Sequence, residues 1–302
     1  MKTHCIGIVG MGELGNAVTE DLLNKTRHRV RIWDWRFDDV ASSAAINLKT
    51  LRQNSRVDAA DSAGSALESC DIVISAVTAD QAIACAASVA LSLEANTYYV
   101  DVNSISPQSK CQVKDIVERR KGRFVEAAVM SPILPLRSDA PILLGGYHAH
   151  DFLEVAKMLP FTNLNVVSHE WGIAAATKMC RSVVVKGIEA LVTESLLSAR
   201  RYGVEAAVIN SLSNVFPRDD WESYATYLIS RSLRHGARRA SEMEEAAKTV
   251  AEVGLNPLMS LATADRQAWA QQHCPRAIPS TLKDLLDEVN SNAATSGAGV
   301  KR

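Results

Sequence analysis

The sequence has few aromatic residues, no excess of charge of one sign, and no long apolar run. Aromatic residues make up 5% of the chain, and alanine is abundant, which favours closely packed helices over a β-sandwich. The formal net charge is −1, so no basic field is available to hold nucleic acid or an anionic membrane surface. No run reaches the roughly 18 apolar residues of a membrane-spanning helix. We therefore expect neither nucleic acid nor membrane as a partner.

The sequence also lacks any CxxC pair, because its six cysteines are scattered along the chain. This spacing predicts neither a metal site nor a disulfide framework, and we expect reduced, mostly buried thiols. The chain opens directly into an apolar strand, without the charged region, apolar stretch and cleavage site of a secretory signal. We expect a cytoplasmic protein.

The first half of the chain alternates strands with alanine-rich helices, and the second half is helical. A chain of 302 residues exceeds what one hydrophobic core usually supports, so two domains are expected. Strands are predicted at residues 5–9, 29–33, 71–77, 97–101 and 123–129. Strands that alternate with helices predict a Rossmann-type, doubly wound parallel sheet covered on both faces.

After about residue 165 the strand signals stop. A long helix over 170–202 is predicted, followed by helices at 205–215, 221–239, 241–253 and 256–273. The domains are therefore expected at 1–165 for the Rossmann domain and 166–291 for an all-α domain. Residues 292–302, rich in Ser, Ala and Gly, are expected to be a flexible tail.

A glycine-rich loop follows the first strand and opens a helix: Gly10-Met11-Gly12-Glu13-Leu14-Gly15. Gly10 permits the tight turn, Gly12 lets the backbone approach a pyrophosphate, and Gly15 lets the helix pack closely on the strand. The helix N-terminus adds partial positive charge for the phosphates. The alternative, a tight turn without a ligand, is disfavoured because strand, loop, helix and a later acidic residue are in register. We predict that this loop binds a dinucleotide.

That acidic residue is Asp34, at the end of the second strand and about 20 residues after the loop. A carboxylate there accepts hydrogen bonds from the adenosine ribose and repels a 2′-phosphate, which favours NAD. Arg36 could instead pair with such a phosphate, so NADP stays open.

Lys178 is unusual because it lies among apolar residues in the first part of the long helix. Most such lysines reach solvent along their aliphatic stems. Here the helix directly follows the cofactor domain, so we expect Lys178 to border a cleft in which substrate binds.

Four segments together resemble the β-hydroxyacid dehydrogenases, the superfamily of 3-hydroxyisobutyrate and 6-phosphogluconate dehydrogenases. They are the glycine loop, Asn103-Ser104-Ile-Ser-Pro107, Met130-Ser131-Pro132, and Gly172 to Lys178. A subgroup with a C-terminal domain of unknown function is more similar still. Its likeness rests on Ala128–Pro132, Ala176–Ser182, Lys186–Leu191 and His235–Met243.

The resemblance implies an NAD(P)-dependent oxidoreductase that acts on a hydroxy acid or related alcohol and forms a homodimer. It implies that Lys178 is the general acid/base, taking the proton of a substrate hydroxyl or returning it. Residues Ala76, Val77, Thr78 and Asn103 are then expected against the cofactor, and Ser104 near the substrate.

The chain departs from the family where an S-G-G segment normally binds a carboxylate through backbone amides. Met130, Ser131 and Pro132 stand there, and proline has no N–H to donate. Ser182 replaces the asparagine usual four residues after the lysine. We expect a substrate with less carboxylate character, or one bound by Arg181, His235, Arg238 or Arg239. The alternative for the arginines is a solvated or subunit-facing helix surface.

Two further functions remain open at this point. An imine reductase shares the architecture, although its catalytic position often carries an acid or a tyrosine instead of a lysine. An NAD(H)-sensing protein would need the Rossmann domain but no acid/base. Lys178 therefore disfavours both. The 6-phosphogluconate dehydrogenase signature itself is missing, and that activity is not predicted.

Overall fold

The computed structural model describes residues 3–297, and the chain divides into two compact units, Met1–Met179 and Cys180–Arg302. The division falls within helix α7 (Ile173–Tyr202), whereas the sequence analysis placed it at residue 165. The first turns of α7 are hydrogen-bonded to the sheet of the first unit, as described below, and this explains the difference.

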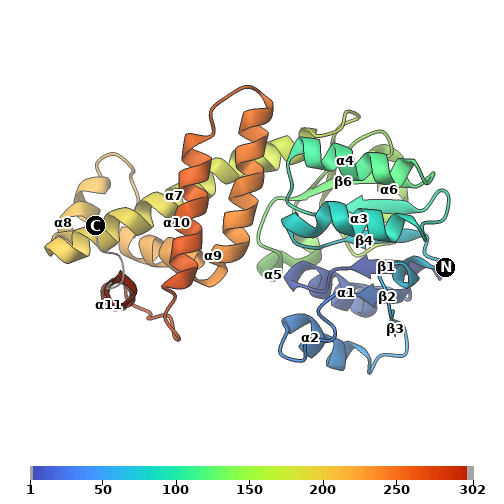
Figure 1. Ribbon diagram of the computed structural model, residues 1–302, viewed down its shortest axis with the longest axis horizontal. Helices are drawn as coiled ribbons and strands as arrows, with labels where there is room; N and C mark the ends of the chain where they lie inside the picture. Colours follow the sequence, from blue (N-terminus) through green and yellow to red (C-terminus); the bar gives the residue numbers. More distant parts are fainter. Residues whose placement is uncertain (1–2, 298–302) are drawn as a thin grey trace. The chain divides into compact units, whose positions relative to one another are not determined.

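The first unit is built on a sheet of eight strands in the order β3-β2-β1-β4-β5-β6-β7-β8 (Figure 1). All neighbouring strands are parallel except β6 and β7. The strands are β1 (Cys5–Val9), β2 (Arg29–Trp33), β3 (Val57–Ala59), β4 (Ile72–Ser75), β5 (Tyr98–Asp101), β6 (Arg123–Val129), β7 (Ile142–Gly145) and β8 (Leu164–Ser168). The helices are α1 (Glu13–Lys25), α2 (Ser43–Leu51), α3 (Ala82–Ala90), α4 (Pro107–Glu118), α5 (Ile133–Leu136) and α6 (Ala149–Ala156), with 3-10 turns η1 (Ser65–Leu67), η2 (Ala79–Gln81) and η3 (Arg137–Asp139).

This topology confirms the predicted Rossmann-type sheet and adds three strands that the sequence analysis did not predict. Strand β3 has only three residues, which is too short for a periodic signal. Strands β7 and β8 extend the sheet beyond β6, and β7 enters antiparallel. An antiparallel strand at the edge of a parallel sheet is common in such folds.

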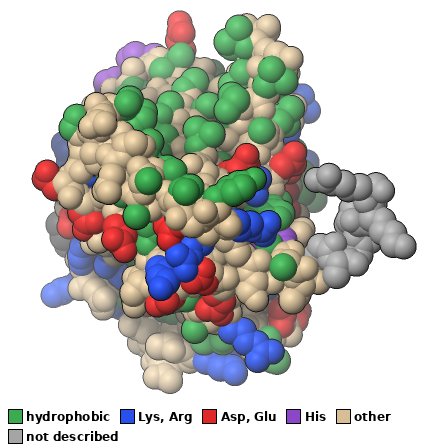
Figure 2. All heavy atoms as spheres, turned by 90° about the vertical axis from the view of Figure 1, so that its left-hand side faces the viewer, with side chains coloured by type: hydrophobic (Ala, Val, Ile, Leu, Met, Phe, Trp, Pro, Cys, Tyr) green, Lys and Arg blue, Asp and Glu red, His purple; other side chains and the backbone are tan. Residues whose placement is uncertain are grey.

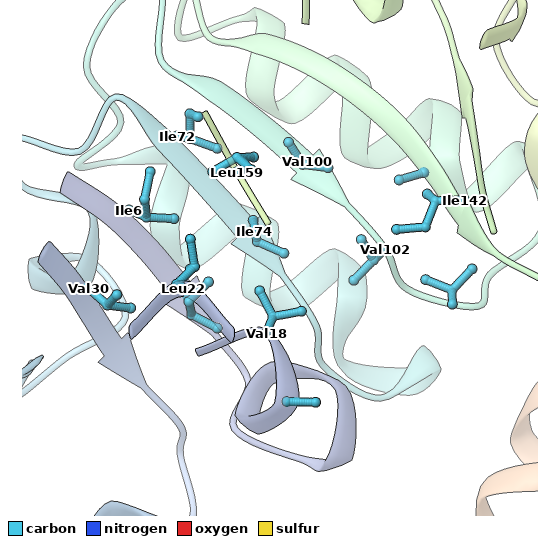
Figure 3. Packing of buried hydrophobic residues seen from close by; sticks show 14 of the residues in the cluster. Ile6, Val18, Leu22, Val30, Ile72, Ile74, Val100, Val102, Ile142 and Leu159 are labelled. Atoms are coloured by element: carbon cyan, nitrogen blue, oxygen red, sulfur yellow. The ribbon is translucent and has the colours of Figure 1, made fainter. Parts of the chain in front are cut away.

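Successive residues along each central strand belong to two different hydrophobic cores. Ile72 and Ile74 pack with α1, α2 and α6, whereas Val73 packs with α3 and α4. Side chains alternate between the faces of a strand, so a continuous apolar run buries both faces of the sheet. Figure 3 shows the first of these cores, with Val18 and Leu22 of α1 against Ile6 and Ile74 of neighbouring strands.

The second unit is helical in its described residues. It holds most of α7, then α8 (Glu205–Leu212), α9 (Trp221–Glu252), α10 (Leu258–Gln272) and α11 (Leu282–Gly297). Its core joins leucines of α7 and α11 to apolar residues of α9 and Ala270 of α10. Two predicted helices, 221–239 and 241–253, form one run that is interrupted by non-helical dihedral angles at His235.

Helix α11 is not predicted by the sequence analysis, and it includes residues 292–297, which were expected in a flexible tail. Its Leu282, Leu285, Leu286 and Val289 are buried at i, i+3, i+4 and i+7, the spacing of one helix face. The rest of the expected tail, 298–302, lies outside the described residues.

Acidic and basic side chains are interspersed on the face shown in Figure 2, in keeping with the net charge of −1. Within residues 3–297, none of the helices combines the length and apolar content that a membrane crossing requires.

Candidate cofactor and active site

The glycine loop lies where β1 ends and α1 begins, at the carboxyl edge of the sheet. Gly10 has φ +95°, in the left-handed region, and a Cβ there would lie 2.4 Å from the carbonyl oxygen of Ala76. A Cβ on Gly15 would lie 1.9 Å from the carbonyl oxygen of Gly10. These two glycines are therefore required by the packing of the protein itself.

Gly12 differs from both, because a Cβ on it would meet no atom of residues 3–297 within 4 Å. It is the N-cap residue of α1, and no side chain caps that helix end. The protein packing thus does not explain a glycine here. A phosphate that approaches uncapped N–H groups does explain it, because only glycine lets the backbone and the anion come this close.

Asp34 connects the end of β2 to the glycine loop. Its Oδ2 accepts a hydrogen bond of 2.7 Å from the backbone N–H of Met11, and its Oδ1 accepts one of 2.9 Å from that of Arg36. The Arg36 guanidinium also pairs with Oδ1 at 3.3 Å. Asp34 is 4% exposed, whereas the Arg36 side chain is 34% exposed. The carboxylate therefore fixes the loop, and the guanidinium is the more accessible of the two charged groups.

The strand ends next to the loop carry the other residues predicted for the cofactor. The backbone of Ala76 donates to the carbonyl of Val9 and so follows β4 directly beside the loop. Val77 is half-buried and Thr78 is exposed. After β5, the buried Asn103 donates from Nδ2 to Ser75 Oγ at 3.0 Å.

The amide oxygen of Asn103 is buried and has no hydrogen-bond partner among the described residues. An unpaired buried acceptor is costly and calls for a partner. Three features therefore fit a bound dinucleotide at this edge: the unpaired Asn103 oxygen, the open space beside Gly12, and the N-terminus of α1 without a side-chain cap.

Beneath this edge lies a buried ion pair that the sequence analysis missed. Lys110 of α4 is 1% exposed, and its Nζ lies 3.1 Å from Asp101 Oδ1 at the end of β5. The same ammonium donates to the carbonyl oxygen of Asp101 at 2.7 Å. Asp101 Oδ1 also accepts from the backbone N–H of Asn103 at 2.9 Å. The pair thus holds the turn that carries Asn103.

A second missed residue, Glu126, joins β6 to the start of α7. Its carboxylate accepts hydrogen bonds from the backbone N–H groups of Gly172, at 2.8 Å, and Ala175, at 2.5 Å. Burial raises the pKa of the Glu126 carboxyl, while the ammonium of Lys110 and the two N–H groups act in the opposite direction. Glu126 therefore caps α7 from within the sheet, as a carboxylate at a helix N-terminus does.

Lys178 lies in the second turn of α7, three residues after the capped Ala175, and its side chain is half-buried. It belongs to the first unit, together with the glycine loop and the strand ends.

Both residues that the sequence analysis missed, Lys110 and Glu126, carried a signal in the sequence. Lys110 occupies the buried face of α4 with Val113 and Val117, and Glu126 interrupts an apolar strand.

The predicted substrate residues are divided between the two units. Ser104, Met130 and Ser131 are half-buried and Pro132 is exposed, all in the first unit. Ser131 Oγ is buried without a hydrogen-bond partner in the described chain.

The other three predicted substrate residues, Arg181, Ser182 and His235, are in the second unit. Arg181 is exposed, and Ser182 Oγ accepts a hydrogen bond from Lys186. His235 is at the break in α9. Of the remaining arginines, Arg239 pairs with buried Glu189 and Arg238 with Glu242.

Comparison with known proteins gives matches to both parts of the chain. The family described as NAD binding domain of 6-phosphogluconate dehydrogenase matches residues 5–159, and a domain of unknown function, DUF1932, matches residues 199–270. A protein from Methanothermus fervidus, described as an uncharacterized 28.5 kDa protein in the 7S RNA 5′ region, is 25% identical over 264 residues. These are 84% of this chain and 94% of that protein.

Solved structures are similar to this chain over nearly its whole length. A conserved hypothetical protein from Sinorhizobium meliloti 1021 is 33% identical with a TM-score of 0.72, covering 96% of this chain and 97% of its own. The 3-hydroxyisobutyrate dehydrogenase of Mycobacterium tuberculosis, solved with L-serine, shares the fold at 18% identity and TM-score 0.69. The match covers 95% of this chain and 99% of that one. The chain therefore belongs to the family described as NAD binding domain of 6-phosphogluconate dehydrogenase, and it also carries the DUF1932 domain.

Proposed function

We propose that the chain is a nicotinamide-dependent oxidoreductase that interconverts a hydroxy acid, or a related alcohol, and its carbonyl form. Lys178 is the general acid/base in this proposal. The observation that carries it is the attachment of α7 to the sheet by Glu126, because it fixes the helix of Lys178 to the unit that contains the dinucleotide loop.

The cofactor would be held by the N–H groups of the glycine loop at its pyrophosphate and by Asp34 or Arg36 at its adenosine ribose. Ala76, Val77, Thr78 and Asn103 would line the nicotinamide half, with Asn103 Oδ1 as a hydrogen-bond acceptor. When bound, the nicotinamide supplies the site that takes up or gives the hydride. NAD is the cofactor we favour, because the Asp34 carboxylate is built into the loop itself.

Lys178 would move one proton in each direction of the reaction. As a neutral amine it accepts the hydroxyl proton of the substrate, while hydride leaves the carbon that bears this hydroxyl. As an ammonium it returns the proton to the carbonyl oxygen. Such a group typically contributes about 10²–10⁴-fold to the rate.

The substrate is expected to be bound differently from a simple 3-hydroxy acid. Pro132 has no N–H, and Met130 already donates its own N–H to the carbonyl of Pro141 at 2.8 Å. Neither residue therefore offers a backbone N–H to a carboxylate, and the Ser131 hydroxyl is buried without a partner among the described residues. Contacts of Ser104, Arg181, Ser182 and His235 with the substrate stay predictions.

The test is a screen of hydroxy acids, sugar acids and alcohols that follows NADH and NADPH absorbance, repeated with Lys178→Ala. We expect turnover of an accepted substrate to fall at least about 100-fold, with cofactor affinity unchanged. Lys157, the exposed C-cap residue of α6, provides the matched control Lys157→Ala, which should keep full activity. Near wild-type turnover by Lys178→Ala would rule out the acid/base role.

Two other outcomes of the screen decide between the alternatives. Turnover only with a ketone and an amine together would indicate an imine reductase. Tight NADH binding without turnover of any compound would indicate a sensor.

We also propose a homodimer. Val184, Ile188 and Leu191 are exposed on α7 at i, i+4 and i+7, so they form an apolar stripe that a second copy could bury. Light scattering coupled to gel filtration measures the molar mass, and a single 32.7 kDa species would contradict the proposal.

A further inference from the structure

Two cysteines lie in contact at the amino-terminal edge of the sheet, away from the candidate active site. Cys5 is the first residue of β1, and Cys70 precedes β4. Their sulfur atoms are 3.4 Å apart. Cys5 is half-buried, whereas Cys70 is 3% exposed.

The pairing of β1 with β4 determines this proximity. Ile6 is opposite Ile72 in the parallel register, and the backbone N–H of Asp71 donates to the carbonyl of Cys5 at 3.1 Å. The backbone pairing of β1 with β4 and with the segment before it therefore holds the two cysteines next to each other. A disulfide has an S–S distance of about 2.05 Å, so the sulfur atoms need to approach by only about 1.4 Å.

The two thiols are also unequal in acidity. The hydrogen bond with Cys70 lowers the pKa of Cys5 to about 7, assisted by Arg31 and Arg29 and opposed by burial and by Asp71. Arg31 is held beside the pair because it donates to the carbonyl of Glu68 at 2.8 Å. The contact with Cys5 and burial raise the pKa of Cys70. Near neutral pH, Cys5 is thus partly a thiolate and Cys70 a thiol.

A metal site is not an alternative explanation for this pair. His4 Nδ1 lies 2.9 Å from Asp71 Oδ2, so these two neighbouring groups pair with each other. Among the described residues, no three His, Cys, Asp or Glu side chains converge as a metal site requires.

We propose that Cys5 and Cys70 form a thiol-oxidation site at which a hydroperoxide converts the pair to a reversible disulfide. The Cys5 thiolate attacks one peroxide oxygen, the O–O bond breaks, and Cys5 becomes a sulfenic acid as hydroxide leaves. The Cys70 sulfur then attacks the Cys5 sulfur, the S–O bond breaks, and the Cys70 proton leaves with the oxygen as water. With hydrogen peroxide, the two thiols lose two electrons and two protons, and the peroxide is reduced to two waters.

The disulfide would link β1 to the segment before β4 without reaching the glycine loop. Cys5 begins β1, whereas Gly10 follows its last residue, Val9, so the two features are at opposite ends of one strand. Oxidation should therefore leave cofactor affinity unchanged. It should raise the thermal unfolding midpoint, because the link closes a chain segment of about 65 residues in the unfolded state.

The experiment oxidises the reduced, full-length protein with a small excess of hydrogen peroxide and maps disulfides by peptide mass spectrometry without reduction. We expect a peptide pair joined through Cys5 and Cys70, formed at least about tenfold faster than any oxidation of half-buried Cys274. Dithiothreitol should reverse it. The exposed Cys180 provides the control variant Cys180→Ser, which should still form the link.

A second readout follows alkylation of Cys5 by iodoacetamide against pH. The rate should be half-maximal near pH 7 in the wild type, and Cys70→Ala should move this midpoint upward because it removes the thiol hydrogen bond. The groups facing Cys5 are Arg31, Arg29, Asp71 and Cys70. The proposal is overturned if peroxide oxidises Cys180 or Cys274 first, or if the linked peptides do not form.

Discussion

Glu126 Oε2 accepts a hydrogen bond of 2.8 Å from the backbone N–H of Gly172, which joins a central strand to the helix of Lys178. The strand paired with β6 makes room for this contact. A Cβ on Gly145, the residue opposite Glu126, would lie 2.8 Å from the same oxygen. One buried carboxyl group thus fixes where α7 begins, on a strand whose other buried residues are apolar.

Replacing Glu126 should therefore affect catalysis without affecting the glycine loop. In Glu126→Gln the amide has one acceptor oxygen, so an N–H of Gly172 or Ala175 loses its partner, at a cost of about 1–3 kcal/mol. We expect kcat to fall at least tenfold, with the Kd of the cofactor changed less than threefold. Steady-state kinetics and fluorescence titration measure these quantities. Glu118→Gln, on an exposed site of α4, should behave as the wild type. An unchanged kcat in folded Glu126→Gln would contradict the positioning role.

Gly12 and Gly15 should respond in opposite ways to the same substitution. Gly12→Ala meets no atom of the described residues, so stability should change by less than about 1 kcal/mol, while cofactor affinity should fall at least tenfold. Gly15→Ala places a Cβ against the Gly10 carbonyl and should destabilise the fold by about 2 kcal/mol or more. Urea unfolding and NADH titration distinguish the two effects. Wild-type affinity in Gly12→Ala would show that the loop does not approach a phosphate closely.

The choice between NAD and NADP should depend on Asp34 and Arg36. If NAD is the cofactor, Asp34→Asn should weaken NADH binding about tenfold or more, since the carboxylate accepts from Met11 and would also accept from the ribose. Arg36→Ala should then change NADH affinity little. Isothermal titration with NADH and NADPH on both variants measures the preference. A large loss of NADPH affinity in Arg36→Ala, from a wild type that favours NADPH, would reverse the assignment.

The Lys110–Asp101 pair should be important for stability because both partners are buried. Lys110→Met removes the ammonium and leaves the Asp101 carboxylate uncompensated, which typically costs about 3–5 kcal/mol. Chemical denaturation measures this loss of unfolding free energy. Lys114 on the same helix pairs with the exposed Asp115. The substitution Lys114→Met should therefore lower the free energy of unfolding by less than about 1 kcal/mol. Equal losses of unfolding free energy in the two variants would show that the buried pair stabilises the protein no more than the exposed one.

The local features of the chain were predictable from the sequence. Strand, glycine loop, helix and Asp34 follow one another within 34 residues, and short-range periodicity and turn chemistry determine each of them. The long helix of Lys178 was predicted for the same reason. Helix α11 was missed although its buried apolar residues have the spacing of one helix face; the Ser-, Ala- and Gly-rich end of the chain indicated a tail instead.

What the sequence alone determined is therefore the dinucleotide-binding unit, the helical second half and the residue types at the candidate site. The tertiary structure decided which buried charges belong together: Lys110 with Asp101, and Glu126 with the start of α7. It also brought Cys5 and Cys70 into contact across 65 residues of chain. These contacts join segments that are distant in sequence, and strand order and register, which arise only when the whole sheet forms, determine them.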